Sequence, residues 1–153
     1  MKIVFTIAFI LVLLFLQIGI FPHLDIAGSF PNLIVLTILG LSILQGWKKS
    51  LPWIIAAGLF LDFYSFSNFL GFSVIALLII SYLAEFLSQS LIKKVNLPSV
   101  LLIFLITIFA YYLILLIFFD LRFIGLIVGI VYNLIFSLPI FYVLKKIQSK
   151  TKV

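Results

Sequence analysis

The side chains that could do chemistry in this sequence are few, and the carboxylates are the first to consider. The chain has four acidic residues and one histidine. Asp62 lies thirteen residues beyond Lys49, within an apolar run. At ~1.5 Å of rise per residue this is ~20 Å of helix, against a hydrocarbon core of ~30 Å. If Lys49 marks one membrane surface, Asp62 is therefore inside the bilayer, where a carboxyl group is costly unless it faces protein.

Three roles are open for Asp62. It is a structural carboxyl satisfied by a neighbouring helix, it binds a proton or a solute, or it lies at the outer rim of the membrane. Gly58 and Ser65 share its helix face, four residues before and three after, and small residues let another backbone approach. A helix contact is the simplest of the three interpretations.

Other polar side chains interrupt the apolar runs at helical spacing. Glu85 follows Ser81 by four residues, and Gln17 is the one strongly polar residue of the first run. Asn133 continues a small-residue stripe at strict four-residue spacing, which predicts close helix packing through Gly125, Gly129 and Ser137. The predicted intramembrane polar or partner contacts are Asp62, Ser65, Gly58, Glu85, Asn133 and Gln17.

Reactive constellations are missing from the sequence. The only histidine, His23, has Asp25 nearby but no further metal ligand, and there is no nucleophile elbow, zinc-protease motif or phosphate-binding loop. Cysteine is absent, which excludes thiol catalysis and disulfides. We therefore expect no enzyme, no catalytic residue, no metal and no cofactor.

Composition places the chain in a membrane. Two thirds of the residues are apolar (66%), 9% are charged, and the mean hydropathy is +1.46. A soluble domain of 153 residues does not need that much apolar surface. The net charge of +6 comes from short clusters between apolar runs, which predicts contact with membrane lipids rather than with nucleic acid.

The apolar runs predict an all-α polytopic protein, with six transmembrane helices in one bundle that forms a single domain over residues 1–153. The expected helices are 3–21, 32–46, 51–66, 71–92, 97–119 and 123–144. The first is expected to remain as a span, because no small-x-small cleavage pattern follows it. Pro52 is expected near the start of the third, and the almost wholly apolar fifth is expected to be the most exposed to lipid.

The basic residues predict the orientation. With six spans, nine of the ten basic residues lie on one side of the membrane, and the one arginine lies on the other. The nine are Lys2, Lys48, Lys49, Lys93, Lys94, Lys145, Lys146, Lys150 and Lys152. Because cytoplasmic loops carry an excess of Lys and Arg, both termini are predicted to be cytoplasmic, in a multi-pass protein of the plasma (inner) membrane.

Several features in order along the chain resemble the rod shape-determining protein MreD family. They are Gln17 in the first helix, Pro31-Asn32, Gly46 with its basic cluster, Gly58-Leu-Phe-Leu-Asp62, Leu70-Gly71, and Asn133 with Pro139 in the last helix. The element around Asp62 is the most specific of these. Together they span nearly the whole chain.

The resemblance implies a non-enzymatic scaffold of the bacterial cell-elongation machinery, which makes peptidoglycan and sets rod shape. Its implied partners are an MreC-like protein, the actin-like MreB, RodA and a penicillin-binding transpeptidase. It also implies a six-helix fold similar to the solute-binding subunits of energy-coupling-factor vitamin transporters. Such a subunit is the alternative function, although Ala8 is followed by Val12 where these subunits carry small residues at four-residue spacing.

Overall fold

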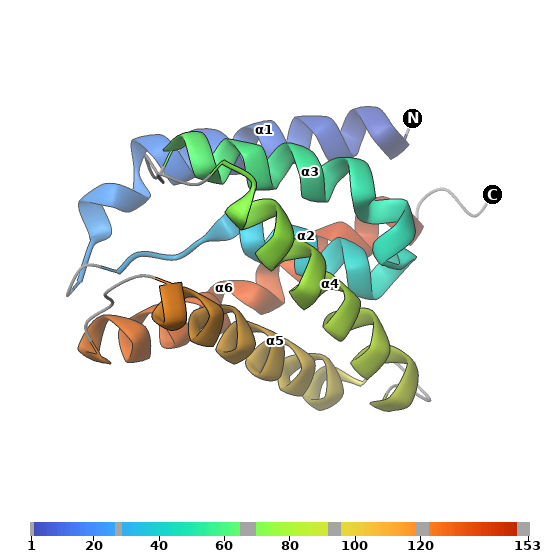
Figure 1. Ribbon diagram of the computed structural model, residues 1–153. Coiled ribbons are helices and arrows are strands. Elements are labelled where there is room, and N and C mark those ends of the chain that lie inside the picture. The colour runs from blue at the N-terminus through green and yellow to red at the C-terminus, as the bar shows by residue number, and fades with distance from the viewer. Residues whose placement is uncertain (1, 27–28, 65–69, 92–95, 119–122, 150–153) are drawn as a thin grey trace.

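The computed structural model describes residues 2–26, 29–64, 70–91, 96–118 and 123–149, and within these ranges the fold is all-helical. Figure 1 shows the helices, with the start of the first helix and the end of the last helix at the same end of the bundle. The elements are α1 (Lys2–Gly19), η1 (Phe21–Leu24), α2 (Leu33–Gln45), α3 (Trp47–Tyr64), α4 (Phe72–Leu91), α5 (Leu97–Phe118) and α6 (Phe123–Ser149).

Four of the described helical segments are long and apolar enough to cross a membrane: Val4–His23, α4, α5 and α6. The chain is thus an all-helical membrane protein. The helix α3 has the required length, but its first turns carry two lysines and a proline. The helix α2 is apolar but has only 13 residues.

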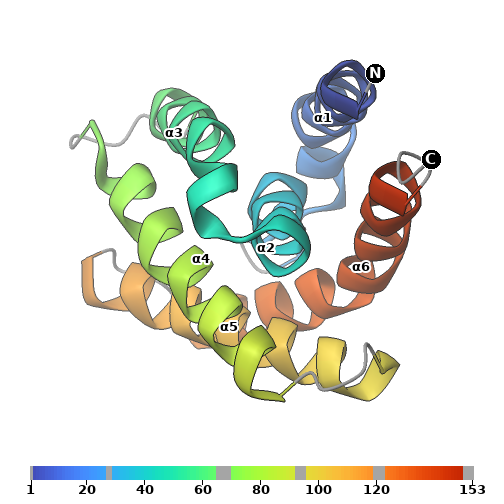
Figure 2. The ribbon, with the colours of Figure 1, turned by 90° about the vertical axis from the view of Figure 1, so that its right-hand side faces the viewer.

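The short helix α2 is the centre of the bundle. Every residue from Leu33 to Ser42 is buried, so α2 has no polar face, and no side of this stretch is exposed at the surface of the bundle. It packs against α1, α3, α4 and α6, and Figure 2 shows it enclosed by these helices. A helix that is apolar all round is stable only when it is covered on all sides, which explains its place.

The chain enters α2 through a non-helical segment, Ser29 to Asn32, that runs along α6 toward the interior of the bundle. The Ser29 hydroxyl donates to the Gly125 carbonyl (2.6 Å) near the start of α6, and the Asn32 N–H donates to Asn133 Oδ1 (2.9 Å). Asn133 lies eight residues beyond Gly125, which is ~12 Å along the helix. The helix α2 therefore begins beside Asn133, well inside the bundle relative to the start of α6.

The helix boundaries correct two expectations. The third helix does not start near Pro52: α3 begins at Trp47, and Pro52 is inside it. Gly46, with φ of 87°, breaks the chain between α2 and α3, and its carbonyl already accepts the Ser50 N–H (3.2 Å). The positive φ favours glycine, so the break occurs at Gly46 and not at the proline.

The last helix is also longer than expected. It continues past Leu144 to Ser149, and Pro139 lies inside it. Gln148 Nε2 donates to Gln45 Oε1 at the end of α2 (3.3 Å), which holds the added turn against the bundle. Lysines in the final turns also suit the negative end of a helix dipole.

The expectation that the fifth helix is the most exposed was wrong. In the apolar stretch of α5, 39% is buried inside the bundle, compared with 22% in the first segment, Val4–His23. Uniform apolarity says that a helix can meet lipid, but not that it does. The helix α5 packs on both α4 and α6, whereas α1 packs on one side only, against α2, η1 and α6.

Candidate functional site

Asp62 lies in the last turns of α3 and binds the start of α4. Its Oδ2 accepts a hydrogen bond from the Gly71 N–H (2.6 Å), and its Oδ1 accepts one from the Ser73 N–H (3.0 Å). The side chain, expected to be shielded from water, is 1% exposed. The first N–H groups of a helix have no partner within the helix and carry partial positive charge, so a carboxylate stabilises them. Asp62 thus acts as an N-cap supplied by the preceding helix.

Glu85 does the same for the start of α3. Its Oε2 accepts from the Trp47 N–H (2.7 Å), and its Oε1 accepts from Gln89 Nε2 (2.9 Å). A Cβ atom at Gly46 would lie 3.2 Å from the Glu85 carboxylate, so a side chain there would crowd the cap. Glu85 is partly buried.

The two carboxylates make α3 and α4 a reciprocally capped antiparallel pair. Each helix supplies, near its own C-terminal half, the acceptor that the other needs at its N-terminus. Gly58 lets the two backbones meet: a Cβ there would lie 2.6 Å from Val74 Cα. Gly58 and Asp62, predicted to share a face, both point to α4. Ser65 lies outside the described residues.

The buried start of α2 is capped by amides. Gln17 Oε1 accepts from the Leu33 N–H (2.8 Å), and Asn32 Oδ1 accepts from the Val35 N–H (3.2 Å). Asn133 Oδ1 accepts from the Asn32 N–H, as described above. Acceptors from α1 and α6 thus meet at one helix end, where Gln17 and Leu33 are buried.

The small-residue stripe of α6 surrounds Asn133. Gly125, Gly129 and Ser137 are all buried. Asn133 Nδ2 donates to the Gly129 carbonyl (2.8 Å) and to the Tyr112 hydroxyl of α5 (3.0 Å). A Cβ at Gly129 would overlap the Tyr112 ring and hydroxyl, so glycine is required for this contact.

Tyr112 was not anticipated from the sequence, because one tyrosine in an apolar helix has no spacing that identifies its partner. It is buried and supplies the hydroxyl that completes the Asn133 amide. Its neighbour Tyr111 is also buried, with the two rings 5.8 Å apart. A buried tyrosine usually finds a hydrogen-bond partner, which is the only general indication available.

The predicted polar residues are therefore separated in space and individually satisfied. Asp62, Glu85, Gln17 and Asn133 serve three different helix starts and do not converge on one reacting centre. Within the described ranges no group of three His, Asp or Glu side chains could hold a metal ion. His23 and Asp25 are exposed. The contact of these residues with other proteins stays a prediction.

Comparison with known protein families identifies the family of this chain. A family described as rod shape-determining protein MreD matches residues 1–147. The chain belongs to the MreD family. Comparisons with curated proteins and with solved structures found no match.

Membership in the MreD family gives the chain a role in rod shape determination. The resemblance predicted from the sequence is thus confirmed. The family is one of shape-determining membrane proteins and is not known for catalysis, which agrees with polar groups that cap helices instead of facing a common cavity.

Proposed function

We propose that this MreD-family protein is a non-enzymatic membrane scaffold of the bacterial cell-elongation machinery. The match to the family over residues 1–147 carries the proposal. The hydrogen bonds of Asp62 and Glu85 support it, because both carboxylates are occupied by backbone N–H groups of the chain itself. Neither is left as a free base or acid for a reaction.

The scaffold crosses the plasma (inner) membrane six times in this proposal. The helix α2 is ~20 Å long, and the extended segment from Ser29 to Asn32 that precedes it along α6 adds up to ~10 Å, which together match a core of ~30 Å. Non-helical backbone is tolerated at membrane depth when its polar groups are satisfied, and here the Asn32 N–H donates to Asn133 of α6 and the Ser29 backbone pairs with that of Ile26. The lysines then lie on the cytoplasmic side together with both termini.

The proposed partners are an MreC-like protein, MreB, RodA and a penicillin-binding transpeptidase. Because the intramembrane polar groups are used within the bundle, the surface left for helices of these partners is the outward apolar one. The helix α1 offers much of it, with Phe5 at 57% exposure and Phe15 at 73%. Association in lipid then depends on close packing of such faces, since lipid gives no hydrophobic drive.

Depletion in the native bacterium, combined with affinity capture of the tagged protein, tests the proposal. We expect rounded cells on depletion and an MreC-like protein among those captured. Asp62→Leu should reduce capture because the start of α4 loses its cap, and Asp62→Asn should retain most of it. The exposed Asp25→Asn is the matched control and should behave as the unchanged protein.

Two results would overturn the proposal. Normal rod shape after complete depletion would remove the assigned role. Capture of an ATP-driven transporter core with a bound vitamin would instead support the solute-binding subunit.

A further inference from the structure

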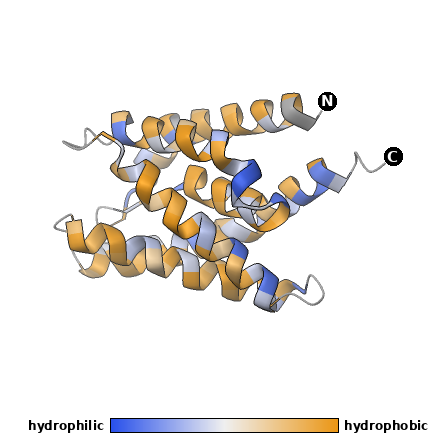
Figure 3. Ribbon diagram, turned by 45° about the vertical axis from the view of Figure 1, so that its right-hand side comes forward, coloured by the Kyte–Doolittle hydropathy of each residue, from blue (hydrophilic) through white to orange (hydrophobic). Residues whose placement is uncertain are grey.

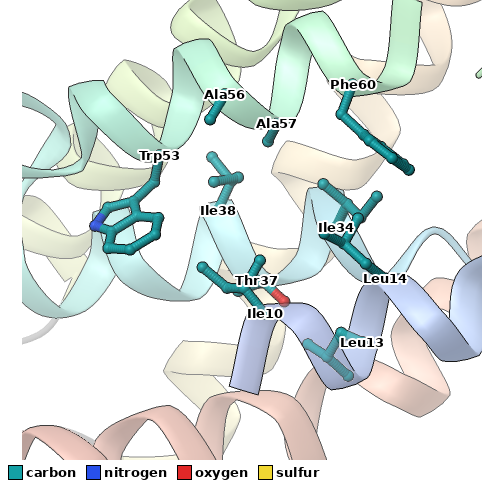
Figure 4. A pocket seen from close by; sticks show the side chains of 10 residues that line it. All are labelled: Ile10, Leu13, Leu14, Ile34, Thr37, Ile38, Trp53, Ala56, Ala57 and Phe60. Atoms are coloured by element: carbon teal, nitrogen blue, oxygen red, sulfur yellow. The ribbon is translucent and has the colours of Figure 1, made fainter. Parts of the chain in front are cut away.

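An apolar groove lies between α1 and α3, with α2 as its floor. The cavity has a volume of about 100 Å³. Figure 4 shows Leu14 of α1, Ile34 and Ile38 of α2, and Ala57 and Phe60 of α3 around it. The Thr37 hydroxyl, which also lines the groove, donates its proton to the Leu33 carbonyl (2.7 Å), and the other lining side chains are apolar except for the indole N–H of Trp53.

The size of the groove decides between possible occupants. Ile34 and Ile38 on its floor are only 4% and 2% exposed, so the opening above them is narrow. A helix with its side chains is roughly 10–12 Å wide, and an apolar cavity of roughly 150 Å³ holds a molecule the size of benzene. The groove is therefore too small for a helix, and its size suits a short stretch of one hydrocarbon chain.

Two lysines lie beyond one end of the groove. Lys49, Trp53, Ala57 and Phe60 lie four, four and three residues apart, which places them along one face of α3. The face is ~16 Å long, close to half of a ~30 Å hydrocarbon core, which is the depth of one leaflet. Lys48 and Lys49 are exposed at its surface end, and neither forms an ion pair with another described residue.

Trp53 lies where a lipid would pass from its chain to its headgroup. It lines the groove between the lysines and Ala57, and Figure 4 shows its indole nitrogen on the side of the ring away from Phe60, toward the lysine-bearing end. Tryptophan prefers this depth in membranes because its ring is apolar and its N–H is polar. Glu85, the one described acidic residue at this end of the α3–α4 pair, accepts a hydrogen bond from the Trp47 N–H.

We propose that the groove binds one acyl chain of an anionic glycerophospholipid, with the lipid phosphate against Lys48 and Lys49. The acyl chain enters from the leaflet on the lysine side and packs against Ala57 and Phe60, with α2 beneath it. The two lysines select an anionic headgroup over a zwitterionic one. This site is separate from the capped helix starts and from the partner binding proposed above.

Fluorescence of Trp53 tests the proposal directly. The chain has two tryptophans, so Trp47→Phe leaves Trp53 alone and keeps an aromatic ring beside Tyr82. The full chain is placed in phosphatidylcholine vesicles that contain a small fraction of phosphatidylglycerol with brominated chains, or of phosphatidylcholine with the same chains. We expect half-maximal quenching at roughly 25-fold less brominated phosphatidylglycerol, since each of the two lysines near the surface favours an anionic lipid by about fivefold.

Two pairs of variants complete the test. Lys48→Gln with Lys49→Gln should abolish the preference, and Lys145→Gln with Lys146→Gln, an equally exposed pair on α6, should retain it. Ala57→Phe should remove the preference by filling the groove, whereas Ala110→Phe on α5, also partly buried, should not. Equal quenching by the two lipids would overturn the proposal, as would a preference that survives Ala57→Phe or that depends equally on the α6 lysines.

Discussion

At the scale of single residues, the polar side chains inside the bundle are explained by backbone groups of the chain. A helix start leaves four N–H groups without partners, and lipid supplies no water to satisfy them. Asp62, Glu85 and Gln17 each accept from such an N–H at the start of another helix. Their cost in an apolar setting is thus offset by the groups that they bind.

Substitution of Asp62 should show this directly. Asp62→Leu leaves the Gly71 and Ser73 N–H groups buried without an acceptor, which should lower the free energy of unfolding by about 2 to 4 kcal/mol. Asp62→Asn keeps one acceptor oxygen and should cost about 1 kcal/mol. Unfolding in mixed micelles with increasing dodecyl sulfate measures both. A loss for Asn as large as that for Leu would show that the negative charge, and not the acceptor, is essential.

Ser81 is predicted to behave in the opposite way. Among the described side chains, its hydroxyl oxygen is the one buried polar atom without a hydrogen-bond partner. Ser81→Ala removes an unsatisfied group at little cost in volume, so the free energy of unfolding should rise by about 1 kcal/mol. The matched change Ser42→Ala removes a hydroxyl that donates to the Ile38 carbonyl (2.9 Å), and it should bring no such gain. The same unfolding assay compares the two.

At the scale of elements, hydropathy predicted the number and approximate position of the helices, and capping decided where they begin. Pro52 was the strongest start indication in the sequence, yet α3 begins at Trp47 because Glu85 caps it from 38 residues away. Such a cap has no local pattern. The acceptor is a side chain that the sequence shows, but the donor is a backbone N–H that every residue except proline carries.

The α3–α4 pair contains a second feature that the sequence predicted only in outline. Gly58 indicated a close approach of some helix, and the structure identifies it as α4. Gly58→Ala should lower the free energy of unfolding by about 1 to 3 kcal/mol, because the added Cβ would lie 2.6 Å from the Val74 backbone and the backbone cannot rotate away. Gly19→Ala, where nothing lies within 4 Å, is the control and should be neutral or stabilising. Equal effects at both positions would contradict the packing.

At the scale of the whole molecule, the central position of α2 accounts for the departure from a simple bundle of equal spans. Four segments have the length and apolarity of a span, and α2 does not. It begins inside the bundle, where Gln17 of α1 and Asn133 of α6 receive it. The fully apolar run of α2 showed that it is buried, but the sequence alone does not show that these two amides meet, because they are 116 residues apart.

The lysines give the last prediction, which concerns the orientation of the molecule. Figure 3 shows hydrophilic positions at the start of α3 and the end of α6, which lie at the same end of the bundle. Asp25 and Lys145 are both exposed, and in the proposed topology they lie on opposite sides of the membrane.

The chain has no cysteine, so Asp25→Cys and Lys145→Cys each introduce a single thiol. With the lysine side in the cytoplasm, an impermeant thiol reagent on intact cells or spheroplasts should label the thiol at 25, and label the one at 145 only after the membrane is opened. Lys48→Cys should follow Lys145→Cys, because α3 starts at the same face as α6 ends. Labelling at 145 but not at 25 in sealed cells would invert the topology, and labelling at both would mean that the chain crosses the membrane an even number of times between them, and not the five times of the proposal.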